Sequence, residues 1–106
     1  MFDAYLDIET TGLSSLYADI TVIGIYLVNG SDSRLVQLVG EKVTKDNLLG
    51  ALDGAHTIYT YNGSRFDLPF IHASLGLDLT DSYYHHDLMY DCWRNNLYGG
   101  FLQYPR

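Results

Sequence analysis

Short apolar runs separated by turn-forming residues divide the first third of the chain into strands. Residues 2–9 alternate apolar and acidic side chains, which is the period-two pattern of a strand with one buried face. Residues 20–28 are β-branched and almost continuously apolar, as expected of a strand that is buried on both faces. A turn cluster at residues 29–32 precedes a short strand at 34–39. Together these two runs predict a hairpin whose linker is longer than the tightest type.

The rest of the chain alternates helices with strands. Thr44 is a suitable N-cap for the first helix, and proline in a first turn marks the start of the second. The predicted elements are a helix at residues 44–54, a strand at 57–61, a helix at 67–76, a strand at 82–87 and a helix at 88–97. The order β-β-β-α-β-α-β-α predicts one α/β domain with a mixed five-stranded sheet and flanking helices.

Composition and charge narrow the classes of function. The chain has 106 residues, of which 47% are hydrophobic and 18% charged, so it is not a disordered segment. Thirteen acidic residues against six basic ones argue against a broad basic face for nucleic acid, but not against a site for divalent cations. The single cysteine excludes an intrachain disulfide framework. Because the chain also lacks a membrane-length apolar run and a secretory signal, we expect a cytoplasmic protein that does not enter membranes.

Asp7 and Glu9 are the first candidates for chemistry. Two positions apart on a strand, their side chains point to the same face, while Leu6 and Ile8 point into the core. Two carboxylates this close are unfavourable unless they are protonated, solvated or bridged by a cation. Mg²⁺ or Mn²⁺ suits such oxygen ligands. The alternative interpretation is a solvated strand end whose acids face water.

A second candidate segment, residues 61–71, ends a strand at Asn62 and begins a helix near Asp67. If this strand and the first one are parallel neighbours, their carboxyl ends share the sheet edge where ligand sites form. Asp67 would then add a third carboxylate. Taken alone, Asp67 is explained as an N-cap and Asn62 as a turn residue. Arg65 is the best candidate for a phosphate contact.

Together the two segments resemble the first two motifs of the DEDD 3′→5′ exonuclease superfamily. Residues 7–13, Asp-Ile-Glu-Thr-Thr-Gly-Leu, resemble the first motif, and residues 62–71 resemble the second, in the order and separation of that family. Within the superfamily the chain is most similar to a ribonuclease H-like group of predicted prokaryotic exonucleases, a similarity supported by His-His-Asp-Leu at residues 85–88. The resemblance covers residues 2–97 and implies a ribonuclease H-like fold.

The resemblance also implies a reaction, the two-metal hydrolysis of terminal phosphodiesters at the 3′ end of single-stranded DNA or RNA. By the pattern of the family, Asp7, Glu9 and Asp67 are catalytic and bind two Mg²⁺ or Mn²⁺ ions, with Asp7 bridging both. Asp87 is a further candidate ligand. The residues expected to bind the substrate are Thr10, Thr11, Gly12, Leu13, Asn62 and Arg65.

The sequence departs from the family at the third motif, Tyr-x-x-x-Asp or His-x-x-x-Asp, which supplies a fourth carboxylate and a general base from a late helix. Residues 83–87 match Tyr-x-x-x-Asp, but they come too soon and fall on a predicted strand, so we interpret the match as coincidental. We therefore expect residues 1–106 to form one domain that is incomplete at its C-terminus, and whether this chain is itself active is left open.

Two alternatives to an active nuclease follow from the departure. The first is a non-catalytic ribonuclease H-like module that binds metal or a partner. The second is a plain structural or dimerisation domain. A truncated sheet would also leave apolar surface uncovered, so self-association is a secondary expectation. A separate zinc or manganese site is also suggested by His85 and His86 with Asp87 and Asp91. Adjacent histidines on a strand face opposite sides, however, and are not expected to share one ion.

Overall fold

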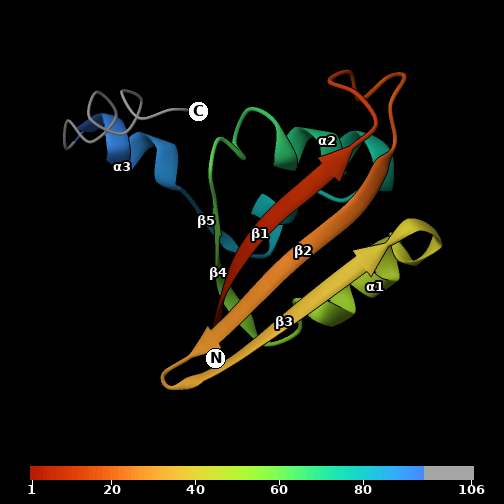
Figure 1. Ribbon diagram of the computed structural model, residues 1–106. Coiled ribbons are helices and arrows are strands. Elements are labelled where there is room, and N and C mark those ends of the chain that lie inside the picture. Colours follow the sequence, from red (N-terminus) through yellow and green to blue (C-terminus); the bar gives the residue numbers. More distant parts are fainter. Residues whose placement is uncertain (95–106) are drawn as a thin grey trace, which may run out of the picture.

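The computed structural model describes residues 1–94 and forms one five-stranded sheet with helices packed on it (Figure 1). The strand order is β3-β2-β1-β4-β5. The strands are β1 (Phe2–Thr10), β2 (Ile20–Asn29), β3 (Asp32–Val39), β4 (Ala55–Thr60) and β5 (Tyr84–Asp87). The helices are α1 (Lys45–Ala51), α2 (Asp67–Leu75) and α3 (Leu88–Arg94), with single 3-10 turns at Gly40–Lys42 and Leu79–Asp81. The predicted element order and the mixed α/β sheet are confirmed; the end of the last predicted helix, residues 95–97, lies outside the described residues.

β1 lies at the centre of the sheet and pairs differently on its two sides. It is antiparallel to β2 and parallel to β4, and β4 is parallel to β5. The predicted long linker between β2 and β3 is wrong, because Asn29 pairs directly with Asp32 and leaves only Gly30 and Ser31 as the loop. Gly30 has φ 62°, and a two-residue hairpin loop favours glycine in that conformation. The polar residue Asp32 joins the ladder because backbone pairing at an exposed edge does not require an apolar side chain.

The core lies between one face of the sheet and the helices α1 and α2, both of which are behind the sheet in Figure 1. Alternate side chains of β1 and β2 point into it, as the period of a strand requires. Thr44 caps α1 as predicted, since its hydroxyl accepts a hydrogen bond from the Asn47 N–H at 3.1 Å. The fully buried residues include Ala4, Ile23, Ile25, Leu27, Leu48, Leu52, Ile58 and Ile71.

The opposite side of the sheet is exposed along β1, β2 and β3. Tyr26 pairs with Tyr5 on one side and with Leu35 on the other, and all three side chains are exposed. We call this side, marked by Tyr5, Asp7, Tyr26 and Leu35, the open face. The prediction that β2 is buried on both faces is therefore wrong for residues 1–94, since only the side facing α1 and α2 is covered.

The helices are short. The longest described one, α2, has nine residues, and none within residues 1–94 is long and apolar enough to cross a membrane.

Candidate metal and nucleic-acid site

The carboxyl end of β1 presents Asp7 and Glu9 on the open face, with Ile8 buried on the other side. β1 pairs with β4 only as far as Tyr5 and Tyr59, so both acids lie beyond the last pair of the parallel ladder. At this point the two strands separate, and the backbone of β1 on that side needs other partners. Such a crevice outside the carboxyl ends of strands is where α/β sheets place ligands.

Asp67 supplies one of those partners. Its Oδ2 accepts a hydrogen bond from the Ile8 N–H at 3.2 Å, and the residue is only 5% exposed. This contact spans 59 residues of sequence and brings the second candidate segment to the first. The interpretation of Asp67 as an N-cap is wrong, because the N-cap position of α2 is Phe66 and has no side-chain capping bond. Asp67 is instead the first residue of the helix, and its side chain points to β1.

The environment of Asp67 disfavours the negative charge of its carboxylate. Burial raises the pKa of Asp67, and the charge of Asp7 raises it further, to about 6, although the Ile8 N–H acts in the opposite direction. The protein thus holds two carboxylates near each other, one of them largely removed from water. A hard dication with oxygen ligands would relieve both the desolvation and the repulsion. The donor chemistry of Asp7 and Asp67 therefore fits Mg²⁺ or Mn²⁺.

The ligand set is incomplete within the part of the chain that the structure describes. There, no group of three or more His, Cys, Asp or Glu side chains is close enough to hold a metal ion. Asp7 and Asp67 are brought together, whereas Glu9 lies on the same face one repeat further along β1. The site is therefore a carboxylate pair with Glu9 next to it, and not a closed cluster.

The loop after β1 carries the predicted substrate-binding residues and is held by its own hydrogen bonds. The Thr10 hydroxyl donates to the Gly12 carbonyl at 2.7 Å, and the Thr11 N–H donates to the Asp19 carbonyl at 2.9 Å. Leu13 projects from this loop and is 88% exposed. This apolar side chain, four residues after Glu9, is therefore accessible from solvent.

The turn between β4 and α2 contains Asn62, Gly63 and Arg65. Asn62 has φ 61°, in the left-handed region that asparagine tolerates. Gly63 lies so close to β4 that an added Cβ would be 2.1 Å from the Thr60 hydroxyl, so only glycine fits there. Arg65 is exposed in the same turn, which leaves its guanidinium accessible to a phosphate.

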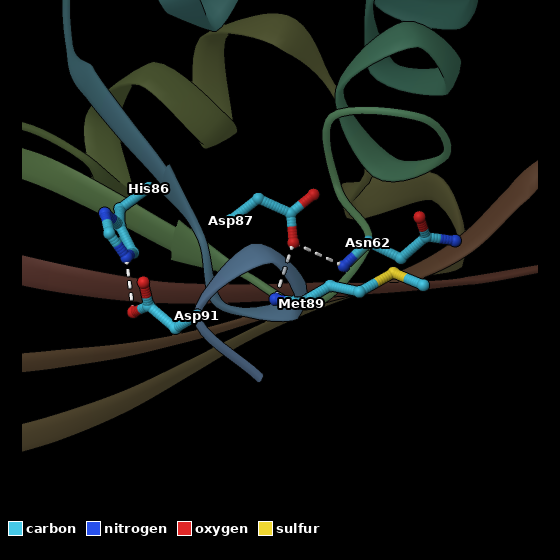
Figure 2. Close-up of polar contacts among 5 residues, drawn as sticks. All are labelled: Asn62, His86, Asp87, Met89 and Asp91. Carbon is cyan, nitrogen blue, oxygen red and sulfur yellow. Dashed lines mark hydrogen bonds and ion pairs between the residues drawn. The ribbon is translucent and has the colours of Figure 1, made fainter. Parts of the chain in front are cut away.

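Asp87, at the end of β5, anchors this turn (Figure 2). Its carboxylate accepts hydrogen bonds from the Asn62 N–H at 2.8 Å, the Ser64 N–H at 3.1 Å, the Ser64 hydroxyl at 2.6 Å and the Met89 N–H at 3.0 Å. Figure 2 shows the Asn62 side chain directed away from Asp87, so that its backbone and not its amide is used for this anchoring.

The pKa of Asp87 reflects these contacts. Burial alone would raise it, but the hydrogen bonds from Ser64, Met89 and Asn62 outweigh burial and lower the pKa below its usual value. The anchoring role of Asp87 and Ser64 was missed from the sequence, although an aspartate directly before a helix, with a bond to the N–H two residues on, is an ordinary capping signal. The role of Asp87 as a metal ligand stays a prediction.

The two histidines of β5 have different partners. The His86 Nε2 lies 2.6 Å from the Asp91 carboxylate, and the two side chains point toward each other in Figure 2. The His85 Nε2 lies 2.8 Å from the Thr60 hydroxyl. Adjacent side chains on a strand face opposite sides, as predicted. The match to Tyr-x-x-x-Asp at residues 83–87 ends on β5, so it is not carried by a helix.

Comparisons with known proteins place the chain in a family. A family model of the RNase H superfamily matches residues 4–104. No protein of curated function matches the sequence.

Solved structures share the fold. Brucella melitensis NrnC bound to pGG superposes with a TM-score of 0.68 at 22% identity, over 91% of this chain and 45% of that one. The family B DNA polymerase of Pyrobaculum calidifontis superposes with a TM-score of 0.62 at 15% identity, over 84% of this chain and 15% of that one. E. coli Exonuclease I in complex with a dA16 oligonucleotide superposes with a TM-score of 0.51 at 13% identity, over 87% of this chain and 30% of that one. The chain thus spans less than half the length of these proteins, and the likeness establishes the ribonuclease H-like fold.

Proposed function

Since this chain belongs to the RNase H superfamily, we propose that it is a metal-dependent 3′→5′ exonuclease domain acting on single-stranded DNA or RNA. The observation that carries this proposal is the hydrogen bond from the Ile8 N–H to Asp67, which holds a buried carboxylate beside Asp7 at the end of β1. A hydrogen bond of this length and burial gives the pair a defined geometry. An acidic pair that only faced water would need no such support.

Asp7 and Asp67, with Glu9 beside them, would hold Mg²⁺ or Mn²⁺ in this domain. When bound, such ions would lower the pKa of a water ligand and offset negative charge on the phosphodiester. Thr10, Thr11 and Gly12 form the ordered loop that would hold the terminal nucleotide, and the exposed Leu13 would pack against its base.

The turn after β4 would contact the remainder of the terminal nucleotide. The Asn62 amide is directed away from Asp87 and is suited to orient the substrate, and Arg65 is suited to a phosphate. Asp87 would act on the substrate indirectly, by holding the backbone of this turn in place.

A second candidate is a non-catalytic module of the same fold that binds metal or a partner. The observation that favours it is the incomplete ligand set, because residues 1–94 contain no acidic cluster of three close side chains. A carboxylate pair is sufficient for weak metal binding but lacks the further groups that a nuclease of this type uses.

The proposed partner is the 3′ end of a single strand. Exonuclease I was solved with a dA16 oligonucleotide, which supports this choice by analogy of fold. The net charge of −7 favours brief contact with a chain end over tight binding of a duplex. We also propose a cytoplasmic location, from the single cysteine, and weak self-association through the exposed apolar residues of the open face.

Isothermal titration calorimetry with Mn²⁺ is the first test of the site. We expect millimolar or tighter Mn²⁺ binding that is lost in Asp7→Asn and in Asp67→Asn. Asp3→Asn is the matched control, because Asp3 is an exposed acid on the same face of β1. Absence of Mn²⁺ binding in the wild-type chain would overturn the exonuclease and the metal-binding form of the second candidate, and would leave only a partner-binding module.

A degradation assay then separates the two candidates. A 5′-labelled single-stranded oligonucleotide with Mn²⁺ should shorten stepwise from its 3′ end, and Asp67→Asn should abolish the shortening. Normal metal binding with an intact oligonucleotide would identify the non-catalytic module. Parallel assays with DNA and RNA oligonucleotides of the same sequence show which of the two the domain prefers.

A further inference from the structure

A groove of about 340 Å³ opens on the open face directly beside Asp7. It lies between β1 and β4 and is lined by Tyr5, Asp7, Tyr59, Tyr61 and Leu88, among others. A larger cavity of about 480 Å³ lies at the amino end of β4, near Gly54 and His56, and is remote from the acidic pair. Volume alone therefore does not identify the functional cavity; the chemistry of the lining does.

Aromatic rings dominate the groove beside Asp7. The rings of Tyr5 and Tyr59 are stacked, with centroids 4.9 Å apart and an interplanar angle of 18°. His86 lies on the other side of Tyr59, with ring centroids 5.8 Å apart. Tyr5 and Tyr61 both remain exposed. The three strands thus place a row of rings across β1, β4 and β5, at the last residue pair before β1 and β4 separate beside Asp7.

The described charges around the groove disfavour a phosphate. Asp7 lines it, and none of the Lys and Arg side chains described within residues 1–92 does. A phenol is neutral at physiological pH, and burial and the neighbouring charge of Asp3 raise the pKa of Tyr59 further. An anionic group would be repelled there. An uncharged, planar and polarisable group would meet ring faces without an electrostatic cost.

We propose that this groove binds a nucleobase of the single strand whose terminal phosphodiester lies at Asp7 and Asp67. The inference rests on the proposed function. It adds that the domain also holds a base of the single strand, outside the metal site. Base stacking on aromatic side chains tolerates any sequence, because every base has a π-face. The groove therefore gives affinity for unpaired bases without selecting among them, and a paired base would not reach it.

An uncharged probe tests the groove independently of metal and of cleavage. In metal-free buffer, adenosine is titrated into the protein while the tyrosine ring resonances are followed by NMR, with ribose as the probe that lacks a base. We expect adenosine to shift the Tyr5, Tyr59 and Tyr61 resonances with millimolar or weaker affinity, and ribose to shift none of them. Adenosine monophosphate should bind more weakly than adenosine, because its phosphate is repelled by Asp7.

Variants on the same face locate the binding. Tyr61→Leu should weaken adenosine binding about fivefold or more, since stacking contributes about 1–3 kcal/mol per base. Tyr61→Phe keeps the ring and should retain wild-type affinity. Tyr26→Leu is the matched control, because Tyr26 is exposed on the open face but does not line the groove. Circular dichroism confirms that each variant is folded.

The outcomes separate this inference from the proposed function. Equal shifts with ribose and adenosine, or equal losses in Tyr61→Leu and Tyr26→Leu, would overturn the groove as a base site. In the degradation assay, Tyr61→Leu should raise KM and leave kcat close to wild type. Adenosine binding that depends on Tyr61, in a chain that never shortens an oligonucleotide, would support the groove and refute the exonuclease.

Discussion

Two aspartates at the same edge of the sheet have similar exposed fractions, and their pKa shifts are opposite in direction. Asp67 is 5% exposed and Asp87 is 6% exposed, yet the pKa of Asp67 is raised to about 6 and that of Asp87 is lowered. Asp67 accepts one hydrogen bond from β1 and faces the charge of Asp7. Asp87 accepts four hydrogen bonds from Asn62, Ser64 and Met89.

The difference shows that burial alone does not decide the role of a carboxylate. The negative charge of Asp87 is already satisfied by neighbouring donors, so this residue is a structural anchor. The charge of Asp67 has fewer hydrogen-bond donors around it and lies beside a second carboxylate, so a bound cation would stabilise it. The predictions below test this contrast between an anchor and a poised ligand.

The largest effect is expected for Asp87→Ala. The change leaves the N–H groups of Asn62, Ser64 and Met89 without their acceptor, and we expect a loss of about 3–4 kcal/mol in the free energy of unfolding. Urea denaturation measures it. Asp91→Ala is the control, because Asp91 bonds to His86 near the surface and should cost less than about 1 kcal/mol. A loss for Asp87→Ala no greater than the control would refute the anchoring role.

Gly63→Ala should follow with a loss of about 2–3 kcal/mol. The new Cβ would overlap the Thr60 hydroxyl at 2.1 Å, and the anchored turn cannot move away without releasing Asp87. Gly50→Ala in α1 is the matched control, since nothing lies within 4 Å of its added Cβ. That control should stabilise the helix by about 0.5–1 kcal/mol. Thermal denaturation measures the change in stability of both variants, which should be opposite in sign.

Asp67→Asn should stabilise the metal-free protein at pH 7–8 by about 1–3 kcal/mol, the opposite of Asp87→Ala. The amide keeps an acceptor for the Ile8 N–H and removes the buried charge. The native pKa of about 6 lies above the usual value of 3.8 for an aspartate in water, so native Asp67 holds its proton more tightly than the unfolded chain does.

The same reasoning sets the pH dependence. The contribution of Asp67 to stability is fully present below about pH 4 and is lost as the pH rises through about 6. Denaturation between pH 4 and 8 in EDTA should therefore show a decline in the wild-type chain that is absent from Asp67→Asn. A parallel pH profile in both proteins would contradict the raised pKa.

The smallest effect is the response to metal. Mn²⁺ at ten times its dissociation constant should stabilise the wild-type chain by about 1.4 kcal/mol at pH 7, because binding occurs only in the folded state. Asp67→Asn should show little of this gain, and Asp3→Asn should show all of it. Thermal melts with and without Mn²⁺ measure the difference. An equal gain in all three proteins would place the ion elsewhere.

Much of the fold could be predicted from the sequence because the signals are local. The alternation in residues 2–9 sets the faces of β1, and it correctly places Asp7 and Glu9 on one side and Ile8 on the other. The order of strands and helices follows from the spacing of apolar runs and turns. Local patterns do not report what covers a face, and for this reason the burial of β2 on both sides was wrong.

The element order, the ribonuclease H-like resemblance and the identity of the candidate acids follow from local patterns of residues. The contacts that each acid makes depend on the folded chain. Asp67 reaches the Ile8 N–H across 59 residues, and Asp87 meets Asn62 and Ser64 from a neighbouring strand. The physical reason is that the pKa of a buried carboxylate depends on how many donors and charges surround it. Those neighbours come from distant segments that only the folded chain brings together.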